Sequence, residues 1–230
     1  MHAFFRCITA IVVLGCLASC AGLNFPGSSQ SAFEAGLGLF NQRKYEDAIP
    51  NFVKATEIDP KFGRAYFYLG RSQLNLRRWA EALAPLRTAY RLSPEETKQE
   101  AVQILIDALI GAGGARLAKG DLRGSVSLFR EAWTLAPNAE RVKKPLADAL
   151  LQSGTQLLAQ GKAAEAVSAF QEVTQLAPKS FKAYIGLARS LLQSGDALKA
   201  LPAAQSALQL APNSSEALSV FSLLGQLQNR

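Results

Sequence analysis

The stretch GTQLLAQGKAAEAVSAFQEVTQLAP, residues 154–178, decides the fold of this chain. Counting back from Pro178, the sequence has Val173 five residues before, Phe170 eight, Ala166 twelve and Gly154 twenty-four. A glycine allows two helix backbones to approach closely, and a phenylalanine fills the space beside them. A proline is favoured at the first position of a helix, where its missing N–H costs nothing. The stretch therefore predicts two closely packed helices, with Pro178 beginning the next one.

The same spacing occurs five times. Equivalent prolines stand 34, 43, 41 and 34 residues apart, at Pro60, Pro94, Pro137, Pro178 and Pro212. Twelve residues before each proline the residue is small: Ala48, Ala82, Ser125, Ala166 and Ala200. The residues eight before are Phe52, Leu86, Phe129, Phe170 and Ala204, and those five before are Ala55, Ala89, Ala132, Val173 and Ala207. The residues twenty-four before are Gly36, Gly70, Gly113, Gly154 and Ala188.

This pattern resembles the tetratricopeptide repeat, a 34-residue helix–turn–helix unit, over about residues 29–212. The departures are Ala204 in place of the large packing residue and Ala188 in place of the glycine. The resemblance implies an all-α, right-handed α-solenoid of about five repeats. Asp59 and Ser93, each just before a proline, are expected to cap helix N-termini.

The expected solenoid covers residues 32–230, with units near 29–62, 63–96, 97–139, 140–180 and 181–214. Units three and four are longer than the 34-residue period. We expect lengthened first helices at about 95–119 and 139–160; a short extra helix before each unit is the alternative. Pro145 either kinks the second of these or marks its true start. Residues 215–230 are expected to form a capping helix over the last apolar face.

The N-terminus has the features of an export signal. Residues 7–18 are an uncharged apolar run after Arg6, too short for the roughly 20 residues that span a bilayer. The sequence Leu-Ala-Ser-Cys at 17–20 resembles the lipobox of bacterial lipoprotein signal peptides. That resemblance implies removal of residues 1–19 and lipidation of Cys20. Cys16 is a second candidate, although bulky Leu14 fits the motif less well.

The short segment directly after Cys20 is expected to be a flexible tether between the membrane anchor and the folded body. Residues 21–31 are rich in Gly, Ser and Pro and carry no charge, so residues 20–31 read as a lipidated cysteine and flexible linker. Two or more acyl chains give stable anchoring. Ala21, where an aspartate would be the retention signal, implies the outer membrane, on its periplasmic side. The alternative is an ordinary secretory signal whose cysteines are incidental.

The positions of the few cysteine and histidine residues argue against an enzyme. All three cysteines and the single histidine lie in the first twenty positions, so the exported body would contain no thiol and no imidazole. Ser-His-Asp, Cys-His and zinc sites need those groups. Residues 111–116 begin like a dinucleotide fingerprint, but Arg116 stands at the third glycine position. We expect no enzyme activity, catalytic residue, metal, cofactor or small-molecule substrate.

Positive charge is concentrated in the second unit. Residues 61–94 carry a net charge of +6, with seven cations against Glu81 alone. An RNA-binding helical repeat is one reading of such a patch. An exported protein rarely meets nucleic acid, so we expect no nucleic-acid partner and favour an acidic protein segment or another envelope anion.

The family geometry implies a groove lined by the first helix of each unit. Carried over by position, its lining is Phe33, Leu37, Phe40, Arg64, Phe67, Arg71, Leu74, Lys182, Ile185 and Arg189. This set predicts an apolar cradle flanked by cations, suited to a protein partner segment of acidic character. The alternative for the apolar members is the core between repeats. Overall the chain resembles the tetratricopeptide lipoproteins that act as pilotins for type IV pilus secretins. An adaptor for peptidoglycan enzymes or for outer-membrane protein assembly is the second hypothesis.

The lipidation of Cys20 can be tested by mass spectrometry of the mature N-terminus. We expect a chain that starts at an acylated Cys20, and a Cys20→Ser protein that is released from membranes. A Cys16→Ser protein serves as the control and should stay membrane-bound. An unmodified terminus, or a membrane-bound Cys20→Ser protein, would contradict the assignment.

Overall fold

The computed structural model describes residues 27–228, and all regular structure in that range is helical. The predicted signal peptide, Cys20 and most of the predicted tether lie outside the described residues. The helices are α1 Ser29–Asn41, α2 Tyr45–Ile58, α3 Gly63–Asn75, α4 Trp79–Leu92, α5 Glu95–Ala118, α6 Leu122–Leu135, α7 Glu140–Ala159, α8 Ala163–Leu176, α9 Phe181–Gln193, α10 Ala197–Leu210 and α11 Ser215–Gln228.

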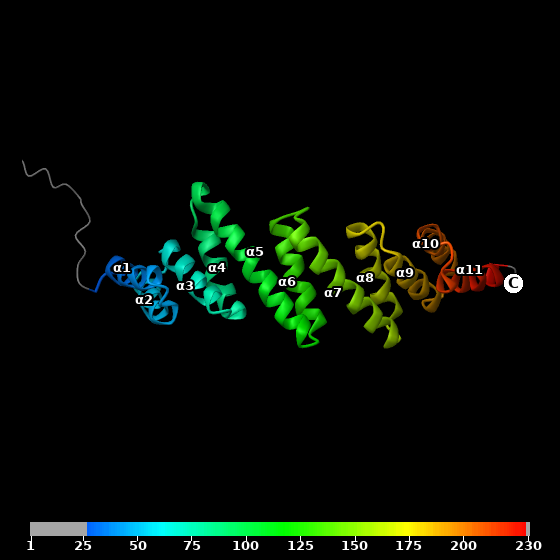
Figure 1. The fold of residues 1–230 in the computed structure, drawn as a ribbon, viewed down its shortest axis with the longest axis horizontal. Helices are drawn as coiled ribbons and strands as arrows, with labels where there is room; N and C mark the ends of the chain where they lie inside the picture. Colours follow the sequence, from blue (N-terminus) through cyan, green and yellow to red (C-terminus); the bar gives the residue numbers. More distant parts are fainter. Residues whose placement is uncertain (1–26, 229–230) are drawn as a thin grey trace, which may run out of the picture.

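The helices form a single row, in chain order, along the long axis of the molecule (Figure 1). Each helix packs against the next one in sequence. The backbones of the odd-numbered helices also approach one another in succession, from α1 to α11, whereas the backbones of the even-numbered helices within the described residues do not. The odd helices are therefore the closely spaced, inner layer of a curved stack, and the even helices form its outer layer. The all-α solenoid expected from the sequence is confirmed.

The repeated glycine marks the closest approach of the two helices in a unit. A Cβ atom added to Gly36 would lie 2.8 Å from the Phe52 ring, and one added to Gly113 would lie 2.6 Å from the Phe129 ring. At Gly70 the added atom would be 2.4 Å from Cγ of Leu86. The position twenty-four before the proline thus packs on the position eight before it. Any side chain on the first would collide with the second.

Unit five departs from the pattern at both positions, and the two departures compensate. Ala188 replaces the glycine and Ala204 replaces the large residue, and both are fully buried. A slightly larger residue on one helix thus meets a much smaller one on the other. The Phe170 ring of α8 supplies bulk from the preceding unit, because an added Cβ on Gly186 would lie 2.3 Å from it. The same ring also packs on Gly154.

The prolines stop helices rather than begin them. At Pro60, Pro137, Pro178 and Pro212 the next helix starts three residues later, so the expected first-position role is wrong there. A residue before proline is disfavoured in the α region. Accordingly Asp59 is extended at φ −130° and ψ 96°, and it terminates α2. Neither Asp59 nor Ser93 caps a helix N-terminus as expected; they are the C-terminal cap residues of α2 and α4. The Asp59 carboxylate accepts a hydrogen bond from the Lys61 N–H, and the Ser93 hydroxyl donates one to the carbonyl of Ala89.

Both long units have continuous, lengthened first helices. α5 has 24 residues and α7 has 20, with Pro145 in the first half of α7 rather than at its start. The segment Lys98–Ala118 of α5 is long and apolar enough to cross a membrane by length and composition. In the fold it packs between α4 and α6, which is the environment of a core helix. Figure 1 shows α5 crossing the full width of the stack.

In each of the five units, the turn between the two helices contains one residue with a positive φ angle. Gly120, Gly161 and Gly195 occupy it in the last three units, whereas Arg43 and Arg77 occupy it in the first two, at φ 61° and 58°. Glycine adopts this conformation without strain and arginine does not. After Gly120 the next helix is capped by Asp121. The backbone N–H of Gly124 donates to this carboxylate and holds the pKa of Asp121 below its usual range.

The close contact at Gly70 predicts opposite effects for one substitution at two glycines. Gly70→Ala should lower the free energy of unfolding by about 1–3 kcal/mol, because Leu86 is buried and has to move. Gly38→Ala should raise it by up to about 1 kcal/mol, since nothing lies within 4 Å of an added Cβ and alanine favours the helix. Urea unfolding followed by circular dichroism measures both. Equal effects would contradict this account of the repeat.

Candidate partner-binding groove

Arg71 is the centre of the inner surface at the N-terminal end. Its guanidinium carbon lies 5.4 Å from the ring centroid of Phe40, 5.3 Å from that of Phe67 and 5.5 Å from that of Tyr68. The rings also hold each other: Tyr68 meets Phe40 edge-on at 5.1 Å and Phe67 at 5.6 Å. Cation–π contacts of this kind are worth about 0.5–1 kcal/mol each at exposed sites. The guanidinium is thereby held in place by apolar contacts, with its polar edge still available.

That polar edge has one charged neighbour. Arg71 Nη1 lies 3.7 Å from Oε1 of Glu100, on α5, beyond hydrogen-bond distance. The Arg71 side chain is 32% exposed and that of Glu100 is 62% exposed. The pair is therefore loose and solvated, and Arg71 makes no side-chain hydrogen bond to another described residue.

A hollow of about 410 Å³ opens beside Arg71, between α3 and α5. Its walls include the Phe67 and Tyr68 rings, Glu100, and the cations Lys61 and Arg64. Arg64 lies over the Phe33 ring at 5.1 Å, and neither Lys61 nor Arg64 forms an ion pair within residues 27–228. The hollow thus joins an aromatic wall to a positively charged rim.

Two residues expected in the groove are instead in the core. Phe33 is 1% exposed and Ile185 is 3% exposed, so neither side chain offers a partner much surface. Phe33 packs among the Phe52, Phe62 and Tyr68 rings. These two apolar positions follow the alternative reading, the core between repeats.

The other expected residues fall into two separate sets. Phe40, Arg64, Phe67 and Arg71 come together at the N-terminal end, with Leu37 and Leu74 half-buried behind them. Lys182 and Arg189 instead line a hollow of about 900 Å³ between α7 and α9, and the nearly fully buried Ile185 also contributes to its wall. There Arg189 Nη1 forms a 2.6 Å ion pair with Glu216 of the capping helix. The groove is thus two hollows of different chemistry.

Sequence reasoning missed Tyr68, Lys61 and Glu100. Tyr68 follows Phe67 directly, but it does not fall on a groove position of the family geometry. Glu100 belongs to the lengthened helix of unit three, where no register could be assigned from sequence. The usable signal was the excess of cations in residues 61–94, which predicts that some of them are paired with acids from a neighbouring unit.

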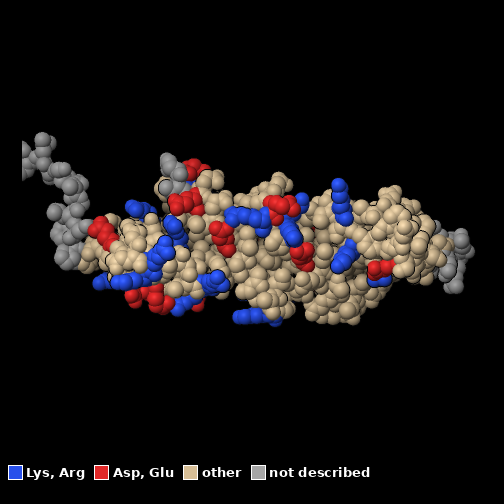
Figure 2. All heavy atoms as spheres, in the orientation of Figure 1, with Lys and Arg blue, Asp and Glu red and all other residues tan. Residues whose placement is uncertain are grey.

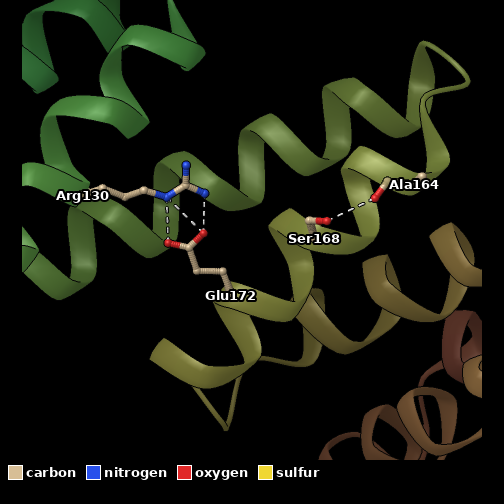
Figure 3. A network of polar contacts seen from close by, with 4 residues as sticks. All are labelled: Arg130, Ala164, Ser168 and Glu172. Atoms are coloured by element: carbon tan, nitrogen blue, oxygen red, sulfur yellow. Dashed lines mark hydrogen bonds and ion pairs between the residues drawn. The ribbon is translucent and has the colours of Figure 1, made fainter.

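The outer layer pairs two of the seven cations in residues 61–94. Arg78, just before α4, pairs with Glu46 of α2 at 2.8 Å, and Arg87 of α4 makes two hydrogen bonds to Glu131 of α6. One step further along, Nε and Nη2 of Arg130, on α6, donate hydrogen bonds to the Glu172 carboxylate on α8 (Figure 3). On the face in view, Figure 2 shows positive and negative side chains interspersed, and few charges at the C-terminal end. These pairs form an inter-repeat ion-pair ladder that includes part of the basic patch.

Residues 27–228 contain no cluster of three or more His, Cys, Asp or Glu side chains that could hold a metal. The chemistry that the groove offers is aromatic contact and guanidinium–carboxylate pairing. Both are means of binding a peptide segment.

The comparisons with known proteins agree with this geometry. A family model described as "Tetratricopeptide repeat" matches residues 33–97 and 151–215, which together make up more than half of the chain. The chain therefore belongs to the tetratricopeptide repeat family. Proteins of this family generally mediate protein–protein interactions, and their scaffold is typically non-enzymatic. No curated protein sequence matches the chain.

Solved structures are similar to this chain, and one of them, with a TM-score above 0.5, shows the same fold. A TPR repeats protein from Bacteroides fragilis has a TM-score of 0.58 and 14% identity, over 88% of this chain and 100% of that one. YrrB, a TPR protein with an unusual peptide-binding site, has a TM-score of 0.37 and 21% identity, over 84% of this chain and 91% of that one. The APC/C hetero-tetramer Cut9–Hcn1 has a TM-score of 0.39 and 17% identity. The match covers 87% of this chain but only 43% of that chain.

The outer ladder predicts a measurable coupling between Arg130 and Glu172. In a double-mutant cycle with alanine at both positions, we expect a coupling free energy of unfolding of about 0.5–1 kcal/mol at low salt. The reason is that two guanidinium nitrogens of Arg130 bond to the same carboxylate. The coupling should fall as salt screens the exposed charges. The single-contact pair Lys98–Glu95 within α5 is the control and should give less than about 0.5 kcal/mol. No coupling at Arg130–Glu172 would contradict a stabilising ladder.

Proposed function

We propose that this protein is a non-enzymatic scaffold that holds a segment of a partner protein at the N-terminal end of its groove. The observation that carries this proposal is Arg71, fixed by three aromatic rings beside a hollow, with a polar edge that makes no hydrogen bond to another described side chain. A pre-positioned cation of this kind costs little further ordering when a ligand binds. The aromatic rings supply contact area, and the guanidinium supplies orientation.

We further propose that the scaffold works as an outer-membrane lipoprotein facing the periplasm. The support is in the sequence: the apolar run, the lipobox-like residues 17–20, and the uncharged linker that follows. With Cys20 acylated, the groove would operate within tether reach of the membrane. A lipid-anchored receptor for a partner segment is what an envelope machine requires of an assembly factor.

Within that class, a secretin pilotin-like role in type IV pilus assembly is our first choice, on the likeness of length, lipobox and repeats. An adaptor for peptidoglycan enzymes or for outer-membrane protein assembly is the second. The RNA-binding reading is weakened by the ion-pair ladder, since three of the seven cations in residues 61–94 face acids.

The proposal is tested by crosslinking in cells, identification of the partner, and binding of the purified partner to groove variants. Phe67→Ala combined with Arg71→Glu should weaken that binding at least tenfold, because the wall and the cation are lost together. Arg123→Glu, on the outer-layer helix α6, makes the same charge change and should bind normally. Circular dichroism must show unchanged helicity. Full binding by the double variant would move the site away from this end.

A further inference from the structure

We infer that Glu100 is a built-in competitor for the partner, occupying the Arg71 edge until an acidic side chain of the partner displaces it. The inference rests on the proposed binding function and adds the class of ligand and the way in which access to it is regulated. Glu100 comes from the neighbouring unit and lies at the rim of the hollow, next to the position that a bound carboxylate would take.

The geometry of the pair separates it from the other ion pairs between units. Arg78–Glu46 and Arg189–Glu216 close to 2.8 Å and 2.6 Å, and Arg87–Glu131 has two hydrogen bonds. Arg71–Glu100 stands at 3.7 Å with no hydrogen bond. The three tighter pairs hold neighbouring units together by direct contact between their charged groups. A loose pair between exposed groups contributes little to stability, so Glu100 can leave at small cost.

The surroundings of Arg71 select an acidic partner. Lys61 and Arg64 line the hollow, and Arg71 lies behind its Phe67 and Tyr68 walls, next to Glu100. Glu100 is the one acid among the described lining residues, so the site keeps an excess of positive charge. The Phe67 and Tyr68 rings form the adjoining wall. The ligand with matching chemistry is a peptide segment in which an aspartate or glutamate stands next to an apolar residue.

Competition makes an unusual prediction: removal of an acid from the site should tighten binding. Because Glu100 both occupies Arg71 and repels an incoming carboxylate, Glu100→Gln should increase affinity for acidic peptides by about twofold to fivefold, the weight of one exposed ion pair. Affinity for neutral peptides should not change. Arg71→Gln should weaken the preference for acidic peptides, because only Lys61 and Arg64 remain, and it should abolish the gain from Glu100→Gln.

The test is an array of short random peptides, graded by their number of Asp and Glu and probed with the purified protein. Glu57→Gln is the matched control: it makes the same substitution at an exposed position on the outer-layer helix α2. Titrations of the retained peptides give the fold-changes. Increased retention of acidic sequences by Glu100→Gln alone, lost in Arg71→Gln, supports the inference.

Two failures are distinguishable. Peptides retained without regard to their acid content, or acidic peptides bound no better by Glu100→Gln than by the wild type, would overturn the competitor role and leave the groove function intact. An equal gain in Glu57→Gln would reduce the effect to net charge and would also overturn it. An array on which neither the wild type nor any variant retains a peptide would contradict the proposed function itself.

Discussion

The rest of this structure depends on one contact: a glycine of the first helix in each unit against a large side chain of the second. The added-Cβ distances of 2.4–2.9 Å at Gly36, Gly70, Gly113 and Gly154 show that this space is already full. Because the two helices meet so closely, their outer faces remain free to pack on adjacent units. Repetition of that contact produces the row of helices, and the row produces an inner surface.

The sequence predicted the stack well, because the contact recurs at fixed spacing and leaves a period in the residue types. Prediction from the sequence failed for residues whose role depends on backbone angles or on neighbours far away in the chain. The prolines were read as helix starts, although the extended residue before each one shows that they act as stops. Phe33 and Ile185 hold groove positions by count, but their rotation into the core is set by packing. The approach of Glu100 to Arg71 depends on how a lengthened helix is placed, and no period encodes that.

The arginines at the N-terminal hollow are held differently from the arginines that join units. In the outer layer, and at Arg189–Glu216 in the inner layer, paired guanidinium groups join consecutive elements through carboxylates. At the N-terminal end of the inner layer, Arg71 is held by aromatic rings and is only loosely paired, and Arg64 is held over one ring. The first arrangement uses up hydrogen-bonding capacity, and the second preserves it. The location of a cation in the stack, rather than its count in the sequence, therefore decides whether it serves the fold or a ligand.

The shared ring of Phe170 has a consequence for how the molecule comes apart. It packs on both Gly154 and Gly186, and no ion pair between described residues joins units four and five. In a linear stack each unit is stabilised only by its neighbours, so cooperativity is no stronger than its weakest junction. A change that displaces Phe170 would therefore disturb units four and five together, while the aromatic groove at the other end stays formed because each unit contacts only its neighbours. Receptor function and C-terminal order would then be separable properties of one chain.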